Sequence, residues 1–145
     1  MSAVEAVADV VLVERFPGVD DYRRLRSITG LSPKGEEAAR RALASTLHGV
    51  SLLRGDEVVG MGRIIGDDGC FYFVVDIAVV PELQGQGLGH RIMAALDAWV
   101  RERAPATAHV SLFADGNAKY LYEKYGFEQL TKSVAMAYVV PSAAT

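Results

Sequence analysis

The chain has 145 residues, of which 50% are hydrophobic and 23% are charged, so it can bury one core and is too apolar for a disordered segment. Its 15 Lys and Arg residues against 18 Asp and Glu residues give a net charge of −3, which disfavours binding to nucleic acids and anionic lipid. No apolar run approaches the roughly 20 residues of a membrane helix. We therefore expect residues 1–145 to form a single domain that is not embedded in a membrane. The single cysteine, Cys70, cannot form an internal disulfide, and the first residues lack the basic stretch of a signal peptide, so we expect a cytoplasmic protein.

The N-terminal third predicts a strand followed by two helices. Residues 10–13 are apolar and mostly β-branched, which indicates a strand. Apolar side chains three residues apart predict a helix over residues 22–30. A second helix is expected to begin at Ser32, a good N-cap, with Pro33 as its first residue, and to end by residue 47.

Three strands are expected next, as an antiparallel meander over residues 50–53, 58–65 and 71–80. Turn residues separate these strands, with Gly55 in the first turn and Gly69 in the second. The third strand is apolar at both alternations along its length. We therefore expect both of its faces to be covered, which places it at the centre of the sheet.

The second half of the chain predicts two more helices and two more strands. The helices cover residues 88–103 and 118–125, and Gly126 closes the second in a left-handed conformation. The strands cover residues 108–113 and 134–140. This order predicts an α+β fold, an α/β sandwich with a mixed sheet of about six to seven strands flanked by about four helices. The last strand has two candidate partners, its own sheet or the edge of a second subunit in a homodimer.

A glycine-rich segment, Gln84-Gly85-Gln86-Gly87-Leu88-Gly89, lies between the central strand and the helix over residues 88–103. Glycines let the backbone approach a ligand closely, and the first amides of a helix present unpaired N–H groups to an anion. The spacing fits neither the dinucleotide fingerprint nor the Walker A loop. The alternative is that the glycines only form a tight turn. Arg91, in the helix that follows, either adds a cation to this site or is a solvated surface residue.

Two motifs in this order resemble the GNAT superfamily of acyl-CoA-dependent N-acyltransferases. The first is the glycine segment, which follows the hydrophobic strand that ends Asp76-Ile77-Ala78-Val79-Val80-Pro81. The second is Ala118-Lys119-Tyr120-Leu121-Tyr122-Glu123-Lys124-Tyr125-Gly126-Phe127. The expected order of helices and strands agrees with that family along nearly the whole chain.

The resemblance implies acetyl-CoA as the co-substrate, no metal, and direct acetyl transfer to an amine in a ternary complex. In the family, the pantetheine arm lies along the central strand and the glycine-loop amides hold the pyrophosphate. Many members carry an Asn near the start of the second motif, where this chain has Asp115 and then Asn117. The cofactor-binding residues implied in this way are Ile77, Ala78, Val79, Gln84, Gly85, Gln86, Gly87, Leu88, Gly89, Asn117 and Tyr122.

Tyr122 and Asp76 are the candidate catalytic residues. Tyr122 matches the family's general acid, and a phenol held near the sulfur can protonate the leaving thiolate; the alternative is a core tyrosine. The resemblance also implies a backbone N–H around Val79 as the oxyanion donor. Asp76 is the one charge in an apolar strand, so it needs a partner there or a raised proton affinity. It is either the base that takes the amine proton or a structural carboxylate bound by arginine, with Arg63 as a candidate partner.

Other groups are weaker candidates for the base. His90 and His109 flank the expected site, Glu82 could relay a proton, and His48 resembles a helix C-terminal cap. A histidine or a water chain therefore stays open as an alternative to Asp76.

The acceptor we expect is a primary amine of a small molecule. The expected N-terminal helices usually shape the acceptor pocket in this fold. Here they carry five arginines, Arg23, Arg24, Arg26, Arg40 and Arg41. In a pocket these would favour an acceptor with phosphate or carboxylate, whereas otherwise they form a solvated face. The alternatives are a protein N-terminus or lysine as the acceptor, or a domain that binds acyl-CoA as a sensor without turnover.

Overall fold

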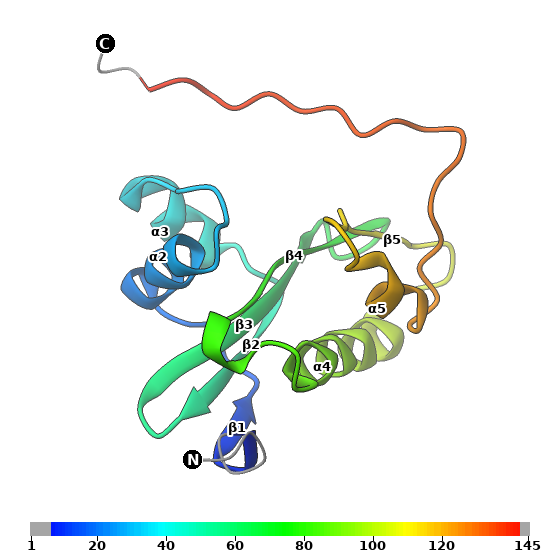
Figure 1. Ribbon diagram of the computed structural model, residues 1–145. Helices are drawn as coiled ribbons and strands as arrows, with labels where there is room; N and C mark the ends of the chain where they lie inside the picture. The colour runs from blue at the N-terminus through cyan, green and yellow to red at the C-terminus, as the bar shows by residue number, and fades with distance from the viewer. Residues whose placement is uncertain (1–6, 143–145) are drawn as a thin grey trace.

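The computed structural model describes residues 7–142, and within them one five-stranded sheet has the strand order β1-β2-β3-β4-β5 (Figure 1). The first four strands are antiparallel neighbours, and β5 joins β4 in parallel. The sheet is therefore mixed, as predicted, with five strands rather than six to seven. The strands are β1 (Val10–Val13), β2 (His48–Arg54), β3 (Glu57–Gly66), β4 (Phe71–Val79) and β5 (His109–Ser111).

Helices cover the two faces of this sheet. They are α2 (Val19–Ile28), α3 (Glu36–Ala44), α4 (Leu88–Arg103) and α5 (Lys119–Glu123), with a 3-10 turn η1 (Pro81–Leu83) between β4 and α4. Adjacent residues of β3 show the two faces: Gly62 faces α4, whereas the side chain of Arg63 is directed to the α2 and α3 side. The α+β class with four helices is confirmed (Figure 1).

Helix α4 packs so closely on the sheet that only glycine fits opposite it. A Cβ at Gly62 would lie 2.6 Å from Ile92 Cγ2 and 3.1 Å from Leu96 Cδ1. Leu88, Ile92 and Leu96 are fully buried, which confirms their predicted position on the inner face of this helix. The start of α4 is thereby fixed against the middle of the sheet.

The predicted start of the second helix is wrong, because α3 begins at Glu36 with Gly35 as its N-cap. Ser32 does not cap it. Its hydroxyl accepts a hydrogen bond from Arg26 Nη2 at 2.9 Å, and its carbonyl accepts one from Arg26 Nε at 2.7 Å. These two bonds from α2 hold Ser32 in the loop before Gly35. The helix of the second motif is also shorter than predicted, although Gly126 after it is left-handed with φ +92°.

The predicted last strand is absent from the described residues. Residues 128–142 contain no strand, their side chains are exposed, and they run away from the sheet as an extended segment (Figure 1). The β-forming pattern of residues 134–140 has no neighbouring strand in the structure, and a strand forms only with a pairing partner. This difference accounts for the smaller number of strands.

The prediction that both faces of β4 are covered is correct for only one face. Tyr72, Val74 and Ala78 are buried, whereas Phe71 is 64% exposed and the remaining apolar side chains of β4 are partly exposed. The parallel partner β5 has three residues, so it covers only the first part of β4.

Within the described residues, no helix has both the length and the apolar character needed to cross a bilayer.

Candidate active site

The two parallel strands, β4 and β5, separate along their length. They pair at three positions, Phe71 with His109, Tyr72 with Val110 and Phe73 with Ser111. Beyond Phe73, the described residues provide no strand partner on this side of β4. Apart from the Val79 carbonyl, which accepts a hydrogen bond from Gln84 Nε2, the backbone polar groups along this edge are therefore available to a ligand. The stretch predicted to hold the pantetheine arm, Ile77 to Val79, lies on this open part of β4.

A β-bulge lies in the open stretch. Between the pairs Met61 with Ala78 and Arg63 with Val75, one residue of β3 faces two residues of β4, Asp76 and Ile77. Asp76 has a left-handed backbone with φ +60°. A bulge redirects the side chains around it. Here it directs Asp76 toward α2, while Ile77 lies beside Gly62 on the α4 side.

Asp76 is bound by three buried side chains. Its Oδ2 accepts hydrogen bonds from Arg63 Nε at 2.7 Å and from the Tyr22 hydroxyl at 3.0 Å, and its Oδ1 pairs with Arg26 Nη1. The side chains of Asp76 and both arginines are 7% to 8% exposed. Burial, and next the negative charge of Asp76, raise the pKa of Tyr22 above its ordinary value. Both carboxylate oxygens are occupied, so the geometry favours the structural interpretation of Asp76 over the base.

Arg63 also connects this cluster to α3. Its Nη1 donates to Thr46 Oγ1 at 3.1 Å and lies 3.3 Å from the Ala42 carbonyl. The network therefore joins α2, the C-terminal end of α3, β3 and the bulge of β4. The sequence offered Arg63 as a partner of Asp76, but Tyr22 and Arg26 were not identified, because they lie about 50 residues earlier in the chain.

The glycine segment forms an open cradle at the start of α4. Gly85 and Gly87 are left-handed, with φ +77° and +86°, and a Cβ on either would meet no atom within 4 Å. Gly87 is the N-cap, and its carbonyl accepts the Arg91 N–H at 3.2 Å. The N–H groups of Leu88, Gly89 and His90 precede Arg91 in the chain. They therefore have no carbonyl acceptor within the helix. Such a helix start suits an anion.

The side chains of the glycine segment have different environments. Gln84 Nε2 donates to the Val79 carbonyl at 2.9 Å, so this side chain ties the loop to the end of β4. Leu88 is buried in the core. The Oε1 atom of Gln86 is buried and has no hydrogen-bond partner within residues 7–142. The structure thus brings all the predicted loop residues together, and the backbone at Gly85 and Gly87 faces open space.

Helix α5 lies beside the start of α4. Leu121 Cδ2 is 3.6 Å from the position of a Cβ on Gly89, and the Tyr125 hydroxyl donates to the His90 carbonyl at 3.1 Å. Tyr122, on the same helix, is half-buried, with its ring edge-on to Phe127 at 6.4 Å. Burial, and next the charge of Asp115, raise the pKa of Tyr122. A phenol that stays protonated suits a proton donor.

The remaining candidates lie farther from the bulge or are engaged elsewhere. Asn117 is exposed in the turn before α5, and its carbonyl accepts the Tyr120 N–H. His109 is exposed and stacks on Phe71, at the paired end of β4. Arg91 Nη1 donates to the Val10 carbonyl at 3.0 Å, so this side chain fixes β1 rather than standing free at the loop.

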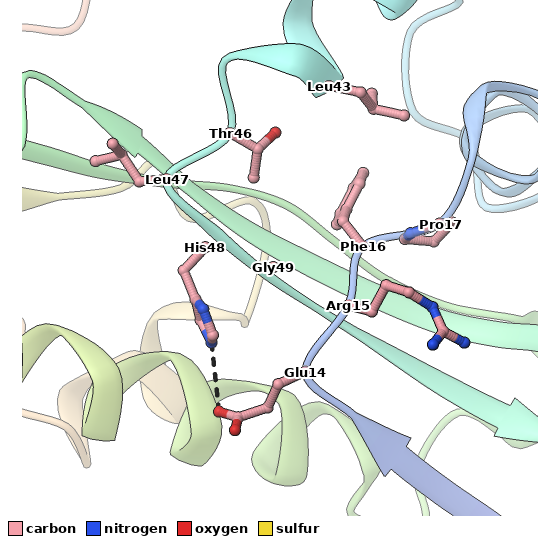
Figure 2. A pocket seen from close by; sticks show the side chains of 9 residues that line it. All are labelled: Glu14, Arg15, Phe16, Pro17, Leu43, Thr46, Leu47, His48 and Gly49. Carbon is pink, nitrogen blue, oxygen red and sulfur yellow. Dashed lines mark ion pairs between the residues drawn. The ribbon is translucent and has the colours of Figure 1, made fainter.

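A surface hollow of about 380 Å³ lies between the segment after β1 and the segment that leads into β2 (Figure 2). His48 is the first residue of β2, so its predicted role as a helix cap is wrong. Its Nε2 lies 3.4 Å from Glu14 Oε1, and its ring stacks on Trp99 at 5.0 Å. These contacts explain the position of His48 by packing.

A second hollow, of about 520 Å³, is basic. It lies along α2 and the loop that follows, and its lining residues are Arg23, Arg24, Ser27, Leu31, Pro33 and Lys34. Of the five arginines singled out in the sequence, two line it, whereas Arg26 binds Asp76 and Arg40 pairs with Glu36 at the surface. Lys34 was not identified from the sequence.

Residues 7–142 contain no group of three or more His, Cys, Asp or Glu side chains placed to hold a metal ion.

Comparisons with known proteins agree with this arrangement. The sequence model of the acetyltransferase (GNAT) domain matches residues 29–140. The Arabidopsis thaliana protein "GCN5-related N-acetyltransferase 2, chloroplastic" is 35% identical over 72 residues, which is 50% of this chain and 27% of that protein. This chain therefore spans much less than the full length of that curated relative.

Two solved structures are similar along most of the chain. SA2161 from meticillin-resistant Staphylococcus aureus, a protein of unknown function, is 37% identical with a TM-score of 0.85, over 91% of this chain and 99% of that one. A "predicted acetyltransferase with acetyl-CoA" from Clostridium acetobutylicum is 18% identical with a TM-score of 0.66, over 88% and 96% of the two chains, a likeness of fold alone. Because the matched residues 29–140 contain the separated strands, the glycine cradle and α5, the chain belongs to the GNAT family of acetyltransferases.

Proposed function

We propose that the protein transfers the acetyl group of acetyl-CoA directly to a primary amine of a small molecule, in a ternary complex. The observation that carries this proposal is that β4 has an unpaired edge beyond Phe73 and is followed by the glycine cradle at the start of α4. The residues present fit acetyl-CoA, because Gly85 and Gly87 leave open space and the buried Gln86 Oε1 still lacks a partner within the described chain.

The backbone would provide most of the recognition. Ile77 to Val79 can pair with the amides of a pantetheine arm as a neighbouring strand would, and the amides from Gly85 to Gly89 can hold the pyrophosphate. The structural neighbour solved with acetyl-CoA supports this choice of co-substrate. Gln84 contributes indirectly, because its bond to the Val79 carbonyl sets the loop against the strand.

Acetyl-CoA supplies an activated acetyl group as a thioester. We assign to the Tyr122 hydroxyl the proton that the departing sulfur requires, and to a backbone N–H near Val79 the stabilisation of the oxyanion. The amine proton leaves through water, since both oxygens of Asp76 are held by Arg26, Arg63 and Tyr22. Asp76 is then a positioning residue that fixes the bulge.

The basic hollow favours an acceptor that carries phosphate or carboxylate. Arg23, Arg24 and Lys34 line it without an acidic side chain among the lining residues. Arg23 Nε donates to the Lys34 carbonyl at 3.0 Å, which leaves its Nη groups for a ligand. Arg24 Nη2 pairs with Asp21 Oδ1 at 3.2 Å, so the positive charge of the hollow comes chiefly from Arg23 and Lys34, which would repel a polyamine and attract an anion.

The test measures acetylated product by mass spectrometry across amino sugars, amino-sugar phosphates, amino acids, arylalkylamines, polyamines and peptides. Mass detection is needed because the exposed Cys70 thiol would react in a thiol-release assay. Product from an anionic small amine supports the proposal, whereas product from peptides alone would indicate a protein acetyltransferase. Acetyl-CoA binding without product from any acceptor would indicate a sensor, and no binding would refute the cofactor site.

Tyr122→Phe tests the proton donor. We expect kcat to fall by about 100-fold or more, the typical contribution of a general acid, while acetyl-CoA affinity by calorimetry stays unchanged. Tyr120→Phe is the matched control, because Tyr120 lies on the same helix and is 57% exposed. Equal turnover in wild type and Tyr122→Phe would remove Tyr122 from the mechanism.

A further inference from the structure

The guanidinium group of Arg26 joins two parts of the molecule that lie on different elements. Its Nη1 pairs with Asp76 Oδ1 in the bulge of β4. Its Nε donates to the Ser32 carbonyl at 2.7 Å, and its Nη2 donates to the Ser32 hydroxyl at 2.9 Å. Because Arg26 is buried, these charge-assisted hydrogen bonds form away from bulk water, where they are strong. One side chain thus connects the bulge to the loop after α2.

The loop that Arg26 holds, residues 29–35, forms one wall of the basic hollow. Three residues of this wall line the hollow: Leu31, Pro33 and Lys34. The backbone of Arg26 also accepts the Leu31 N–H at 2.9 Å. Residues 32–35 are exposed, so little packing holds them in place. The position of the wall therefore depends on Arg26.

The other end of this connection is a strained part of β4. Asp76 has φ +60°, a left-handed conformation that a residue other than glycine keeps only where its surroundings hold it. Arg26 is one of the three side chains that hold Asp76. A pantetheine arm paired with the backbone of Ile77 to Val79 would fix the next residues of the same strand. Both contacts favour the same conformation of the bulge, so each should strengthen the other.

We propose that Arg26 is a positioning residue that couples the acetyl-CoA site to the basic hollow, so that each ligand binds more tightly when the other is present. Acetyl-CoA fixes the bulge, Asp76 in the bulge holds Arg26, and Arg26 holds the wall of the hollow at Ser32. The coupling is reciprocal, so an anionic acceptor in the hollow stabilises the same bulge. This inference rests on the proposed function, because it places acetyl-CoA along β4 and the acceptor in the hollow.

Ser32→Ala tests the connection at its exposed end. It removes the hydroxyl that accepts Arg26 Nη2 and leaves the pair of Arg26 with Asp76 intact. Arg26→Lys is a second variant, because lysine keeps a positive charge beside Asp76 but lacks the fork of donors that binds Ser32 at two atoms. Ser45→Ala is the matched control. Ser45 is also an exposed serine, at the end of α3, and its hydroxyl makes no hydrogen bond within residues 7–142.

Hydrogen exchange in the presence of acetyl-CoA, without an acceptor, measures the coupling. The bond from the Leu31 N–H to the Arg26 carbonyl breaks when the loop opens, so the Leu31 amide reports on the wall of the hollow. We expect saturating acetyl-CoA to slow its exchange about fivefold or more in wild type and in Ser45→Ala, the lower end of typical couplings between sites. In Ser32→Ala and Arg26→Lys the slowing should be less than about twofold.

Calorimetry on the same samples separates failure of this inference from failure of the proposed function. Absence of acetyl-CoA binding would overturn both. Binding to wild type with unchanged exchange at Leu31 would overturn the coupling alone. Equal slowing in wild type, Ser32→Ala and Arg26→Lys would show that Arg26 does not carry the coupling.

Kinetics with an anionic acceptor from the product screen distinguishes positioning from a general loss of structure. We expect Ser32→Ala to raise the KM for this acceptor about fivefold or more while kcat stays unchanged, because the wall of the hollow is displaced and the reacting groups are not. Ser45→Ala should leave both constants unchanged. A lower kcat with an unchanged KM in Ser32→Ala would overturn the assignment of Arg26 to the hollow.

Discussion

Replacing Asp76 by Asn tests whether this carboxylate is the electrostatic centre of the fold. Asp76 accepts hydrogen bonds from Arg63 at 2.7 Å and from Tyr22 at 3.0 Å, and it pairs with Arg26. Asparagine has nearly the same size and, like aspartate, tolerates the left-handed backbone at φ +60°. The substitution therefore removes the charge with little added backbone strain.

The expected loss of stability follows from the buried guanidinium groups. Arg26 and Arg63 are each 8% exposed and would stay in the interior without a counter-charge. Removing one partner of a buried ion pair costs about 3–5 kcal/mol, and because two cations depend on one carboxylate we expect about 4–5 kcal/mol. At roughly 2–4 °C per kcal/mol for a domain of this size, Tm falls by roughly 8–20 °C.

Urea unfolding followed by circular dichroism at neutral pH measures this loss. Glu36→Gln is the matched control, since it makes the same change of carboxylate to amide in a surface pair. Glu36 lies 3.2 Å from Arg40, and both side chains are more than 60% exposed. Such an i,i+4 pair contributes about 0.3–0.5 kcal/mol.

A loss in Asp76→Asn no larger than in Glu36→Gln would refute the electrostatic argument. The rate of acetyl transfer against pH separates the two roles of Asp76 in protein that remains folded. A positioning residue lowers kcat without moving the acidic limb of the profile. Loss of that limb would instead identify Asp76 as the base.

Two further predictions concern the glycine cradle and the pH dependence of stability. Gly87→Ala places a Cβ on a residue with φ +86°, which costs about 1–2 kcal/mol of backbone strain. Acetyl-CoA affinity, measured by calorimetry, should therefore fall roughly 5- to 30-fold. Gly35→Ala is the control, because Gly35 has φ −65° and open space around it, so affinity should stay unchanged. Burial and then Asp76 raise the pKa of Tyr22, so its stabilising contribution is present below about pH 10 and is lost as pH rises through the folded-state pKa. Tm should therefore fall less between pH 9 and 11 in Tyr22→Phe than in wild type, and parallel Tm curves would contradict this.

Local patterns in the sequence were sufficient for the order of the elements as far as α5 and for the position of the glycine segment. The inner face of α4 at Leu88, Ile92 and Leu96 follows from helical periodicity, and the left-handed Gly126 follows from its place after a helix. The glycine segment could be predicted as an anion site because backbone recognition of an anion depends on a few adjacent residues. These features are decided within a few residues along the chain, and they are the part of the site that the sequence predicted.

Contacts between distant residues determined the rest. The bulge at Asp76 depends on its register against β3, and its partners Arg26 and Tyr22 lie 50 and 54 residues earlier. A nearer contact also matters: Ser32 is a good N-cap by composition, yet its hydroxyl accepts a hydrogen bond from Arg26 in α2, and α3 starts later, at Glu36. The alternating apolar pattern of residues 134–140 predicts a strand but not its partner, because the pattern along one strand does not identify the strand edge with which it pairs. The sequence by itself thus determined the four helices, the first five strands and the place of the glycine segment, whereas tertiary structure decided the partners of Asp76 and the number of strands, since both depend on pairing across the fold.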